Sequence, residues 1–171
     1  MNLNLESNIS KSEVFEQVRE ELEKGGFNIV DQDQSRPWGG FYVIDESQSE
    51  KFIQTFLNNV PEAKQNGPGK ISPKILIVES AKRLSWQYHH RRAEVWKVIG
   101  GKAGVVISDD DEQTPLQKKT VGDIIVLKQG ERHRLIGTEG WGVIAEIWQH
   151  TDPGAPSNED DIVRVSDDFG R

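Results

Sequence analysis

The sequence predicts an all-β barrel or sandwich that carries helical additions on its N-terminal side. From Lys74 to Gln149, short segments rich in Val, Ile, Leu and Trp recur about every eight to twelve residues, and Gly, Asp or Pro turn signals separate them. The chain has 171 residues, which is enough to bury the core of one domain. Since no repeat or linker divides it, we expect a single domain over residues 1–171.

A helix is predicted over residues 11–24, ahead of the barrel. Ser10 and Glu13 have the spacing of a capping box, in which each side chain accepts a hydrogen bond from the other residue's free backbone N–H. Apolar residues then follow at every fourth position, at Val14, Val18 and Leu22. The apolar stripe is narrow, so we expect this helix to pack on the outside of a larger body. Residues 1–9 are polar and are expected to be loose.

The middle of the chain adds two strand candidates and a second helix. Residues 27–30 form a short apolar segment, and residues 35–45 read as a turn followed by a strand. Aromatic and aliphatic side chains at i,i+4 spacing predict a short helix over 49–57, and a loop rich in Pro and Gly is expected over 61–73.

The barrel strands and the tail complete the expected domain. The predicted strands are 74–79, 84–88, 95–99, 104–108, 117–120, 124–127, 133–137 and 141–149. The acidic tail over 157–171 keeps a few apolar residues, so we expect a helix or an extended arm that lies on the barrel. The predicted organisation is a helical extension over 1–26 and a barrel over 27–171 with an insertion at 47–70.

Composition narrows the possible functions. A net charge of −7 argues against a nucleic-acid surface, which needs a basic face. The absence of cysteine excludes disulfides, cysteine metal sites and thiol nucleophiles. The N-terminus lacks the features of a targeting leader, and no apolar run reaches the length of a membrane span, so we expect a cytoplasmic protein without a membrane partner.

A possible metal site lies in the stretch from Leu84 to Gly101. Gln87 and His89 share one face of a strand, and Glu94 can rejoin them if the chain turns through residues 90–93. His133, after a glycine turn, is the natural fourth ligand. Such nitrogen and oxygen ligands suit a divalent ion such as zinc, manganese, iron or cobalt. The alternative is that the adjacent histidines 89 and 90 are polar turn residues.

The spacing of these residues resembles the two motifs of cupins, G-x5-H-x-H-x3,4-E-x6-G and G-x5-P-x-G-x2-H. Ala81 stands in place of the first glycine, Gln87 in place of the first histidine, and Lys128 in place of the proline. The stretch Gln-Tyr-His-His-Arg-Arg-Ala-Glu-Val-Trp is similar to the C-terminal cupin domain of type II mannose-6-phosphate isomerases. That family typically has a third histidine where Arg91 stands here.

Two further segments carry the same resemblance. They are Arg36-Pro-Trp-Gly39 upstream, and Glu159-Asp-Asp-Ile-Val-Arg164 with Phe169-Gly-Arg171 at the end. Together the three segments span about 135 residues in the family's order. The resemblance implies a cupin-type double-stranded β-helix (jelly-roll) barrel. The N-terminal helix and the 47–70 insertion are extra, and the nucleotidyltransferase domain often fused to this cupin is absent from the sequence.

The resemblance also implies a reaction and a set of site residues. The reaction is a metal-dependent aldose–ketose isomerisation of a phosphorylated sugar, mannose 6-phosphate to fructose 6-phosphate, through an enediolate. Zinc is the expected ion, with manganese, iron, cobalt or nickel as alternatives. Arg92 would bind phosphate or stabilise the enediolate, His90 would shuttle a proton, and Lys74 would contact phosphate. The expected substrate-binding residues are Arg36, Trp38 and Arg164.

Several alternatives stay open at this point. The substrate could be another phosphosugar, such as a heptose or glucose phosphate, or the barrel could hold metal and sugar without catalysis. An oxygen-using metalloenzyme is a third reading. Arg92 could be a surface residue that pairs with Glu94 or Asp111, and Lys74 could lie at a solvated strand edge. Arg164 with Arg171 could close the tail onto the barrel through a salt bridge. Cupins often pair through barrel edges, so a homodimer is possible.

Overall fold

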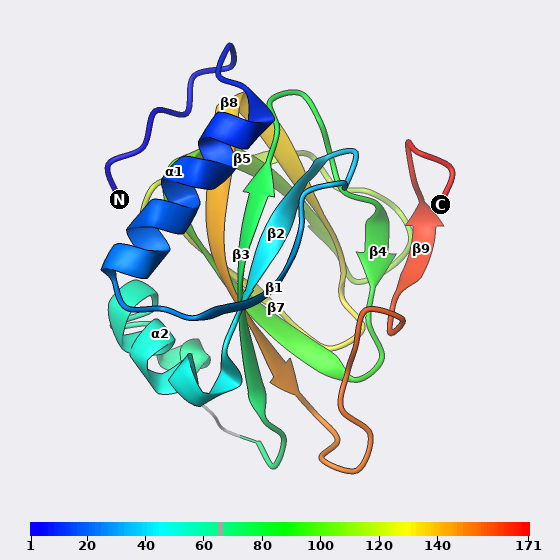
Figure 1. The fold of residues 1–171 in the computed structure, drawn as a ribbon. Coiled ribbons are helices and arrows are strands. Elements are labelled where there is room, and N and C mark those ends of the chain that lie inside the picture. Colours follow the sequence, from blue (N-terminus) through cyan, green and yellow to red (C-terminus); the bar gives the residue numbers. More distant parts are fainter. Residues whose placement is uncertain (65–66) are drawn as a thin grey trace.

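A computed structural model describes residues 1–64 and 67–171, which fold into an antiparallel barrel with two helices packed on one side (Figure 1). The helices are α1 (Lys11–Lys24) and α2 (Ser49–Phe56), and single 3-10 turns lie at Glu46–Gln48 and Pro61–Ala63. The strands are β1 (Ile29–Asp33), β2 (Gly39–Ile44), β3 (Ile71–Val78), β4 (Trp86–Tyr88), β5 (Arg92–Ser108), β6 (Gln117–Thr120), β7 (Ile124–Leu127), β8 (Arg132–His150) and β9 (Val163–Ser166).

Two long strands, β5 and β8, build both layers of the barrel. The N-terminal half of β5 pairs with the C-terminal half of β8. With β3 and β7 they form the first layer, which β2 and β1 extend. The other halves of β5 and β8 pair in the second layer with β6 and β4, and β9 adds to β4. The chain passes between layers at Gly101, where φ is +64° and a Cβ would lie 2.0 Å from the carbonyl oxygen of Trp141. Only glycine fits such an approach.

This arrangement corrects one sequence expectation. The segments 95–99 and 104–108 belong to one strand, β5, and the segments 133–137 and 141–149 belong to β8. The glycines between these segments predict strand ends, but in the structure they bend strands that continue, with register shifts in the β5–β8 pairing. The all-β class and the β6 and β7 bounds are as predicted.

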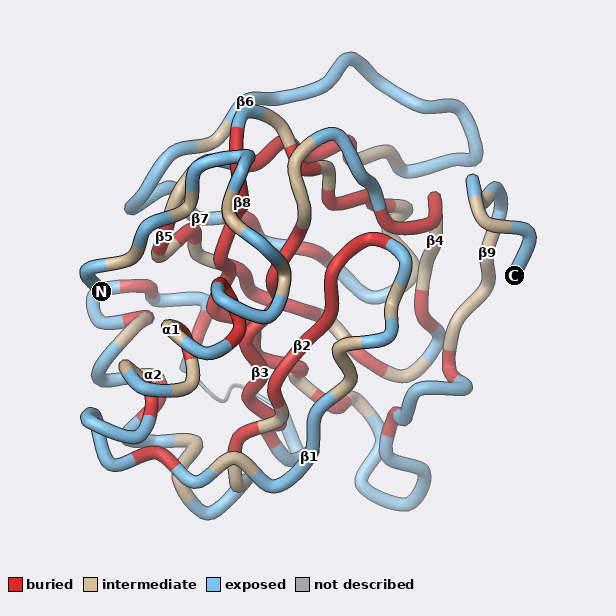
Figure 2. The backbone as a smooth tube through the Cα atoms, turned by 45° about the horizontal axis from the view of Figure 1, so that its top comes forward, coloured by how far each residue is buried: buried red, intermediate tan, exposed pale blue. Residues whose placement is uncertain are grey.

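The strand β3 is buried on both faces, and this explains why its sequence is a nearly continuous apolar run. Its inward residues join the barrel core with Trp38, Trp96 and Leu135, and its outward residues pack under the helices. Every residue of β3 is buried. Figure 2 shows the buried chain concentrated in the barrel strands and the exposed chain in the surrounding loops. The inward face also carries polar residues at one end of the barrel, and these form the site described below.

The two helices match their predictions closely. α1 has the predicted bounds, and Ser10 and Glu13 form the capping box. The buried stripe lies against the outer face of the first layer, where the hydroxyl of Tyr42 donates a 2.9 Å hydrogen bond to the carbonyl oxygen of Phe15. Residues 1–9 are less loose than expected, because Trp141 donates hydrogen bonds from its backbone and side chain to the carbonyl oxygens of Leu5 and Ile9.

Two other elements begin at positions that differ from the sequence expectations. β1 begins two residues later than the 27–30 segment, and β3 begins at Ile71, inside the predicted 61–73 loop. Pro73 fits near the start of β3 because β2 pairs with β3 only from Lys74 onward. Residues 65 and 66 of the predicted 47–70 insertion lie outside the described residues.

The tail was expected to form either a helix or an extended arm, and it forms the extended arm. Its strand β9 pairs with β4, so the end of the chain lies on the open side of the barrel (Figure 1). In the described part of the chain, neither helix has the length and apolar character needed to cross a membrane.

Candidate functional site

The four predicted ligands converge at one end of the barrel interior. Gln87 lies on β4 directly opposite His133 of β8, and His89 follows β4 by one residue. Glu94 reaches the same point from β5, on the facing layer. His89, Glu94 and His133 are buried, and one ligand atom from each lies within 4.8 Å of the others. Strand alternation and barrel closure therefore assemble the group that the spacing predicted.

The histidines are oriented as metal ligands are. Nδ1 of His89 lies 2.7 Å from the carbonyl oxygen of Asp161, and Nδ1 of His133 lies 3.0 Å from that of Glu131. A carbonyl only accepts, so each Nδ1 carries the proton and each Nε2 presents a lone pair. The two Nε2 atoms are 3.3 Å apart, and they lie 3.3 and 3.6 Å from the carboxylate oxygens of Glu94.

These converging acceptors fit a divalent cation. Two imidazoles and a carboxylate form a common ligand set for zinc and for other first-row metals. The amide nitrogen of Gln87 lies 3.5 Å from Nε2 of His89, and a half-turn of that amide would present its oxygen instead. The protein thus has a buried His-Glu-His group that could hold a metal, with Gln87 beside it.

Electrostatics keep the group in the protonation state that a metal requires. Burial lowers the pKa of His89 to about 4, helped by the charge of Arg92, so its imidazole is neutral at physiological pH. Burial likewise lowers the pKa of His133. Burial alone would raise the pKa of Glu94, but the nearby charge of Arg92 and the two histidines outweigh it, and that pKa is lowered. Neutral imidazoles and an ionised carboxylate are the metal-binding forms.

Arg92 is buried beside Gln87, His89, Glu94 and His133, which are called the metal group below. Its Nε donates a 2.7 Å hydrogen bond to Glu94, and one terminal nitrogen lies 3.2 Å from Nε2 of His89. The guanidinium stacks 3.5 Å from the ring centroid of Trp148 and also donates to the hydroxyl of Ser157. Arg92 is 6% exposed, so the alternative of a solvated surface residue is wrong.

Lys74 also points into the barrel. It is 5% exposed, and its ammonium group pairs with Glu159 and lies 4.0 Å from the ring centroid of Trp148. The alternative of a solvated strand edge is therefore wrong for this residue as well.

His90 lies elsewhere. It is exposed at the turn after β4, where its ring contacts Tyr88 edge-on, and within the described chain the pocket lining does not include it. The physical reason is that adjacent side chains of an extended segment point in opposite directions, so His89 faces inward and His90 faces outward. The structure does not bring His90 together with the other predicted catalytic residues.

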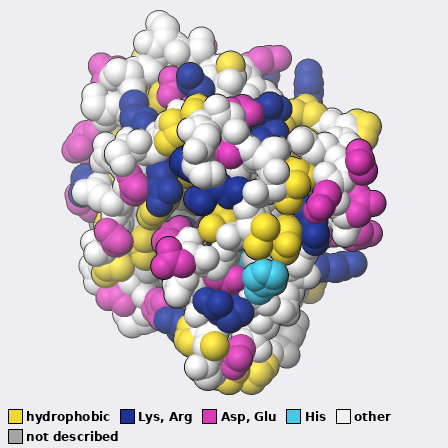
Figure 3. Space-filling view, turned by 90° about the vertical axis from the view of Figure 1, so that its right-hand side faces the viewer, with side chains coloured by type: hydrophobic (Ala, Val, Ile, Leu, Met, Phe, Trp, Pro, Cys, Tyr) yellow, Lys and Arg dark blue, Asp and Glu magenta, His cyan; other side chains and the backbone are white. Residues whose placement is uncertain are grey.

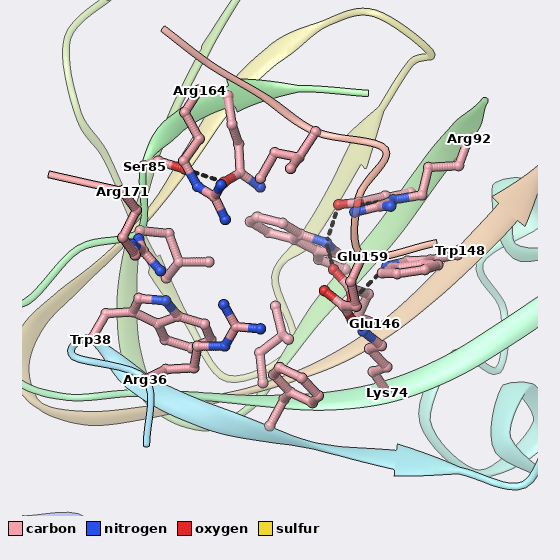
Figure 4. A pocket seen from close by; sticks show the side chains of 17 residues that line it. Arg36, Trp38, Lys74, Ser85, Arg92, Glu146, Trp148, Glu159, Arg164 and Arg171 are labelled. Carbon is pink, nitrogen blue, oxygen red and sulfur yellow. Dashed lines mark hydrogen bonds and ion pairs between the residues drawn. The ribbon is translucent and has the colours of Figure 1, made fainter. Parts of the chain in front are cut away.

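A pocket inside the barrel borders the metal group through Gln87 and Glu94, and Figure 4 shows the side chains that line it. Arg92, Glu146, Trp148, Glu159 and Lys74 lie on one side of it. On the opposite side lie residues of the two other segments that resemble the isomerase family. Arg36 and Trp38 come from the upstream segment, and Arg164 and Arg171 come from the C-terminal segments. Figure 3, which views the molecule from the β4–β9 side, shows Lys and Arg side chains gathered in the middle of that face.

The three arginines carry more positive charge than their partners neutralise. Arg36 lies 2.9 Å from Asp33, and Arg171 pairs with Asp167 through two nitrogens at 2.9 and 3.0 Å. The buried Nε of Arg164 has no hydrogen-bond acceptor among the described residues. Burial and the nearby charges of Arg171 and Arg36 lower the pKa of Arg164. An anion placed among these groups would relieve their repulsion.

The predicted salt bridge between the tail and the barrel exists, but through other residues. Arg83 binds Asp168 through two nitrogens, one at 2.9 Å, and Arg171 pairs within the tail itself. Arg164 therefore keeps its place in the pocket. Trp38 is buried at the arginine side of the pocket, where its position suits either a core residue or a wall of the pocket.

Two important residues escaped the sequence analysis. Asp161 holds the turn before β5, because its carboxylate accepts hydrogen bonds from the backbone N–H groups of His90 and Arg91 at 2.9 and 3.0 Å. Glu146 lies on the inner face of β8 and lines the pocket. A signal for Glu146 was present, because a single acid stands inside the apolar run Val143-Ile-Ala-Glu-Ile-Trp148.

Comparisons with known proteins show what this chain is similar to. The family described as the C-terminal domain of mannose-6-phosphate isomerase matches residues 62–167. A mannose-1-phosphate guanylyltransferase of Salmonella montevideo is 33% identical over 98 residues, covering 57% of this chain and 19% of that protein. The alginate biosynthesis protein AlgA of Pseudomonas aeruginosa is 34% identical over 103 residues, covering 60% of this chain and 20% of that protein. The chain thus spans about a fifth of the length of these relatives.

Solved structures show the same fold at low sequence identity. Tomato vicilin covers 77% of this chain and 32% of its own, with 14% identity and a TM-score of 0.50. A cupin 2 conserved barrel protein from Salinispora arenicola covers 49% of this chain and 65% of its own, with 21% identity and a TM-score of 0.41. The antiparallel barrel that the cupin motifs predicted is confirmed by the strand pairing of this chain.

Proposed function

This chain belongs to the family of mannose-6-phosphate isomerase C-terminal domains, and on that premise we propose that it isomerises a phosphosugar, mannose 6-phosphate to fructose 6-phosphate. One observation carries the proposal. A single pocket has a metal-compatible group on one side and three convergent arginines on the other. A phosphosugar has matching ends, namely vicinal oxygens at its carbonyl end and a phosphate at the other.

The arginine side would bind the phosphate. Arg36, Arg164 and Arg171 offer planar donors to a dianion, and Arg164 has a free Nε–H within the described structure. Trp38 beside them would form a wall for the sugar. This placement would fix the distance of the reacting carbons from the other side of the pocket, which is how orientation contributes to catalysis.

The opposite side would carry the chemistry. Gln87, His89, Glu94 and His133 would hold a divalent ion, with zinc as the expected ion, and a bound ion there would polarise the sugar carbonyl. Arg92 is fixed by Glu94 and Trp148, so its guanidinium would stabilise negative charge on the enediolate oxygens. Lys74 is held by Glu159 and the face of Trp148, and it would add a second positive charge near the sugar.

The test measures metal content and turnover on the same preparation. Metal analysis should find close to one divalent ion per chain, and mannose 6-phosphate should be converted to fructose 6-phosphate. Chelation should abolish conversion, and Arg92→Ala should lower it by about 100-fold or more. Arg19→Ala, on the outer helix α1, is the matched control and should behave as the unmodified protein. Full activity after complete metal removal would contradict the mechanism.

The choice of sugar is tested in the same assay. Conversion of a heptose or glucose phosphate in preference to mannose 6-phosphate would keep the reaction and change the substrate. Tight binding of all these phosphosugars without any conversion would instead indicate a non-catalytic binding barrel.

A further inference from the structure

The isomerisation proposed above needs a group that moves a proton between two adjacent carbons. Such a group must line the pocket and must be able to accept a proton. Among the residues that the structure describes, three carboxylates line it: Glu94, Glu146 and Glu159. Glu94 belongs to the metal group and forms an ion pair with Arg92. The side chain of Glu159 is 54% exposed and forms an ion pair with Lys74. Glu146 is left as the carboxylate with the surroundings of a proton carrier.

Strand pairing holds Glu146 on the side of the pocket that carries Arg92 and Lys74. It lies on β8, with Lys74 of β3 as its neighbour on one side and Trp96 of β5 on the other. It is 4% exposed, and Figure 4 shows it between Arg92 and Lys74 at the pocket wall. This position follows from the inward face of the first layer, which presents Lys74, Glu146 and Trp96 side by side.

The hydrogen bonds of Glu146 orient the carboxyl group without neutralising it. One oxygen accepts a 2.9 Å bond from the indole N–H of Trp148, and the other accepts a 2.7 Å bond from that of Trp96. Both donors are neutral and cannot give up their protons. Burial, followed by the negative charge of Glu94, raises the pKa of Glu146 to about 8, against the opposing charges of Lys74 and Arg92. A carboxylate in such surroundings is a stronger base than one in water.

We propose that Glu146 is the catalytic proton carrier of the isomerisation, an inference that rests on the function proposed above. In the open-chain aldose, the carboxylate takes the hydrogen of C2 as a proton. The C2–H electron pair forms the C1–C2 double bond, and the carbonyl electrons move to O1. The proton of O2 then passes to O1, and Glu146 returns its proton to C1 as the C2 carbonyl forms. Atoms and charge balance, and no other reactant is needed.

The experiment follows the substrate hydrogen in heavy water. Metal-loaded protein is mixed with mannose 6-phosphate, and NMR measures both the conversion to fructose 6-phosphate and the incorporation of deuterium at the reacting carbons. The variants are Glu146→Gln and a matched control, Glu139→Gln, which makes the same change at an exposed position of the same strand. Metal content and the affinity for mannose 6-phosphate are measured on each variant.

Glu146→Gln should lower conversion and deuterium incorporation together by at least about 100-fold, while metal content and affinity stay within about threefold. Glu139→Gln should match the unmodified protein. Deuterium incorporation by Glu146→Gln at close to the normal rate would overturn the proposal, and so would a loss of metal that accounts for the lost activity. If Glu146→Gln does not fold, Glu146→Asp keeps the carboxyl group, and normal exchange with that shortened side chain would equally overturn it.

The failure of the proposed function looks different from the failure of this inference. If the unmodified, metal-loaded protein neither converts any phosphosugar nor exchanges its hydrogen, the function itself is wrong. If the unmodified protein converts the sugar and Glu146→Gln does so equally well, only the role of Glu146 is wrong.

Discussion

Removal of the Asp161 carboxylate should loosen the metal group, although Asp161 is not a ligand. Its two oxygens accept hydrogen bonds from the backbone N–H groups of His90 and Arg91 and from the hydroxyl of Ser157, at 2.9, 3.0 and 2.6 Å. Its own carbonyl oxygen accepts the Nδ1–H of His89 at 2.7 Å. The side chain therefore fixes the tail backbone that orients a metal ligand.

The magnitude follows from the bonds that would be lost. Asp161 is 3% exposed and its hydrogen bonds to the two backbone N–H groups are partly buried, so Asp161→Ala would leave both donors in a place that water reaches only in part. Each hydrogen bond to a charged group contributes about 1.5 to 3 kcal/mol, so the loss of two such bonds should lower the free energy of unfolding by about 3 to 6 kcal/mol. Loss of a partner that orients a ligand typically weakens metal binding about 10- to 100-fold.

Urea unfolding measures the stability, and competition with a chelator measures the metal affinity. Asp160→Ala is the matched control, because it removes the same side chain from the adjacent, exposed position. Asp161→Asn keeps one acceptor oxygen and should fall between the two. If Asp161→Ala binds metal as tightly as Asp160→Ala, the carboxylate does not orient His89 and the reasoning is refuted.

Three other predictions follow from single features of the structure. Arg164→Ala should weaken mannose 6-phosphate binding about tenfold without changing metal content, as titration calorimetry and metal analysis would show, because it removes a free donor from the arginine side. Glu146 has a pKa raised to about 8, against about 4.5 unfolded, so the stability that it contributes is present below pH 4.5 and is lost as the pH rises to 8. In metal-free protein, the stability of Glu146→Gln relative to the unmodified chain should therefore increase by about 2 kcal/mol from pH 5 to pH 7 in urea unfolding, and a pH-independent difference would contradict this. Ala81 has φ +61°, where the cupin motif has glycine, so Ala81→Gly should raise the unfolding free energy by about 0.5 to 1 kcal/mol, and a loss of stability would count against strain there.

The sequence by itself determined the parts that depend on neighbours along the chain. The capping box and four-residue period set α1, and the bounds of the helix agree with the prediction. The residues expected to hold a metal also came from spacing, because alternation on β4 and the turn before β5 leave few ways to place Gln87, His89 and Glu94, and His89, Glu94 and His133 do lie together. The resemblance to the isomerase C-terminal domain rested on such local motifs, and the family match over residues 62–167 confirms it.

The local sequence was less informative at glycines, because a glycine can either end a strand or bend a strand that continues. The glycines between residues 99 and 104 predicted the end of a strand, but Gly101 bends β5, which continues. The sequence shows that a glycine permits an unusual backbone angle, but it does not show whether the chain pairs again beyond it. That depends on the partner strand.

Only the tertiary structure decided which distant residues share the pocket. Arg36 and Arg164 come from opposite ends of the chain, and Asp161 reaches back to orient His89, because barrel closure brings β9 beside β4. The same closure placed Glu146 between two indole groups on the inner face. Spacing along the chain fixes which face of a strand a side chain occupies, whereas contacts between strands far apart in sequence depend on how the whole sheet curls.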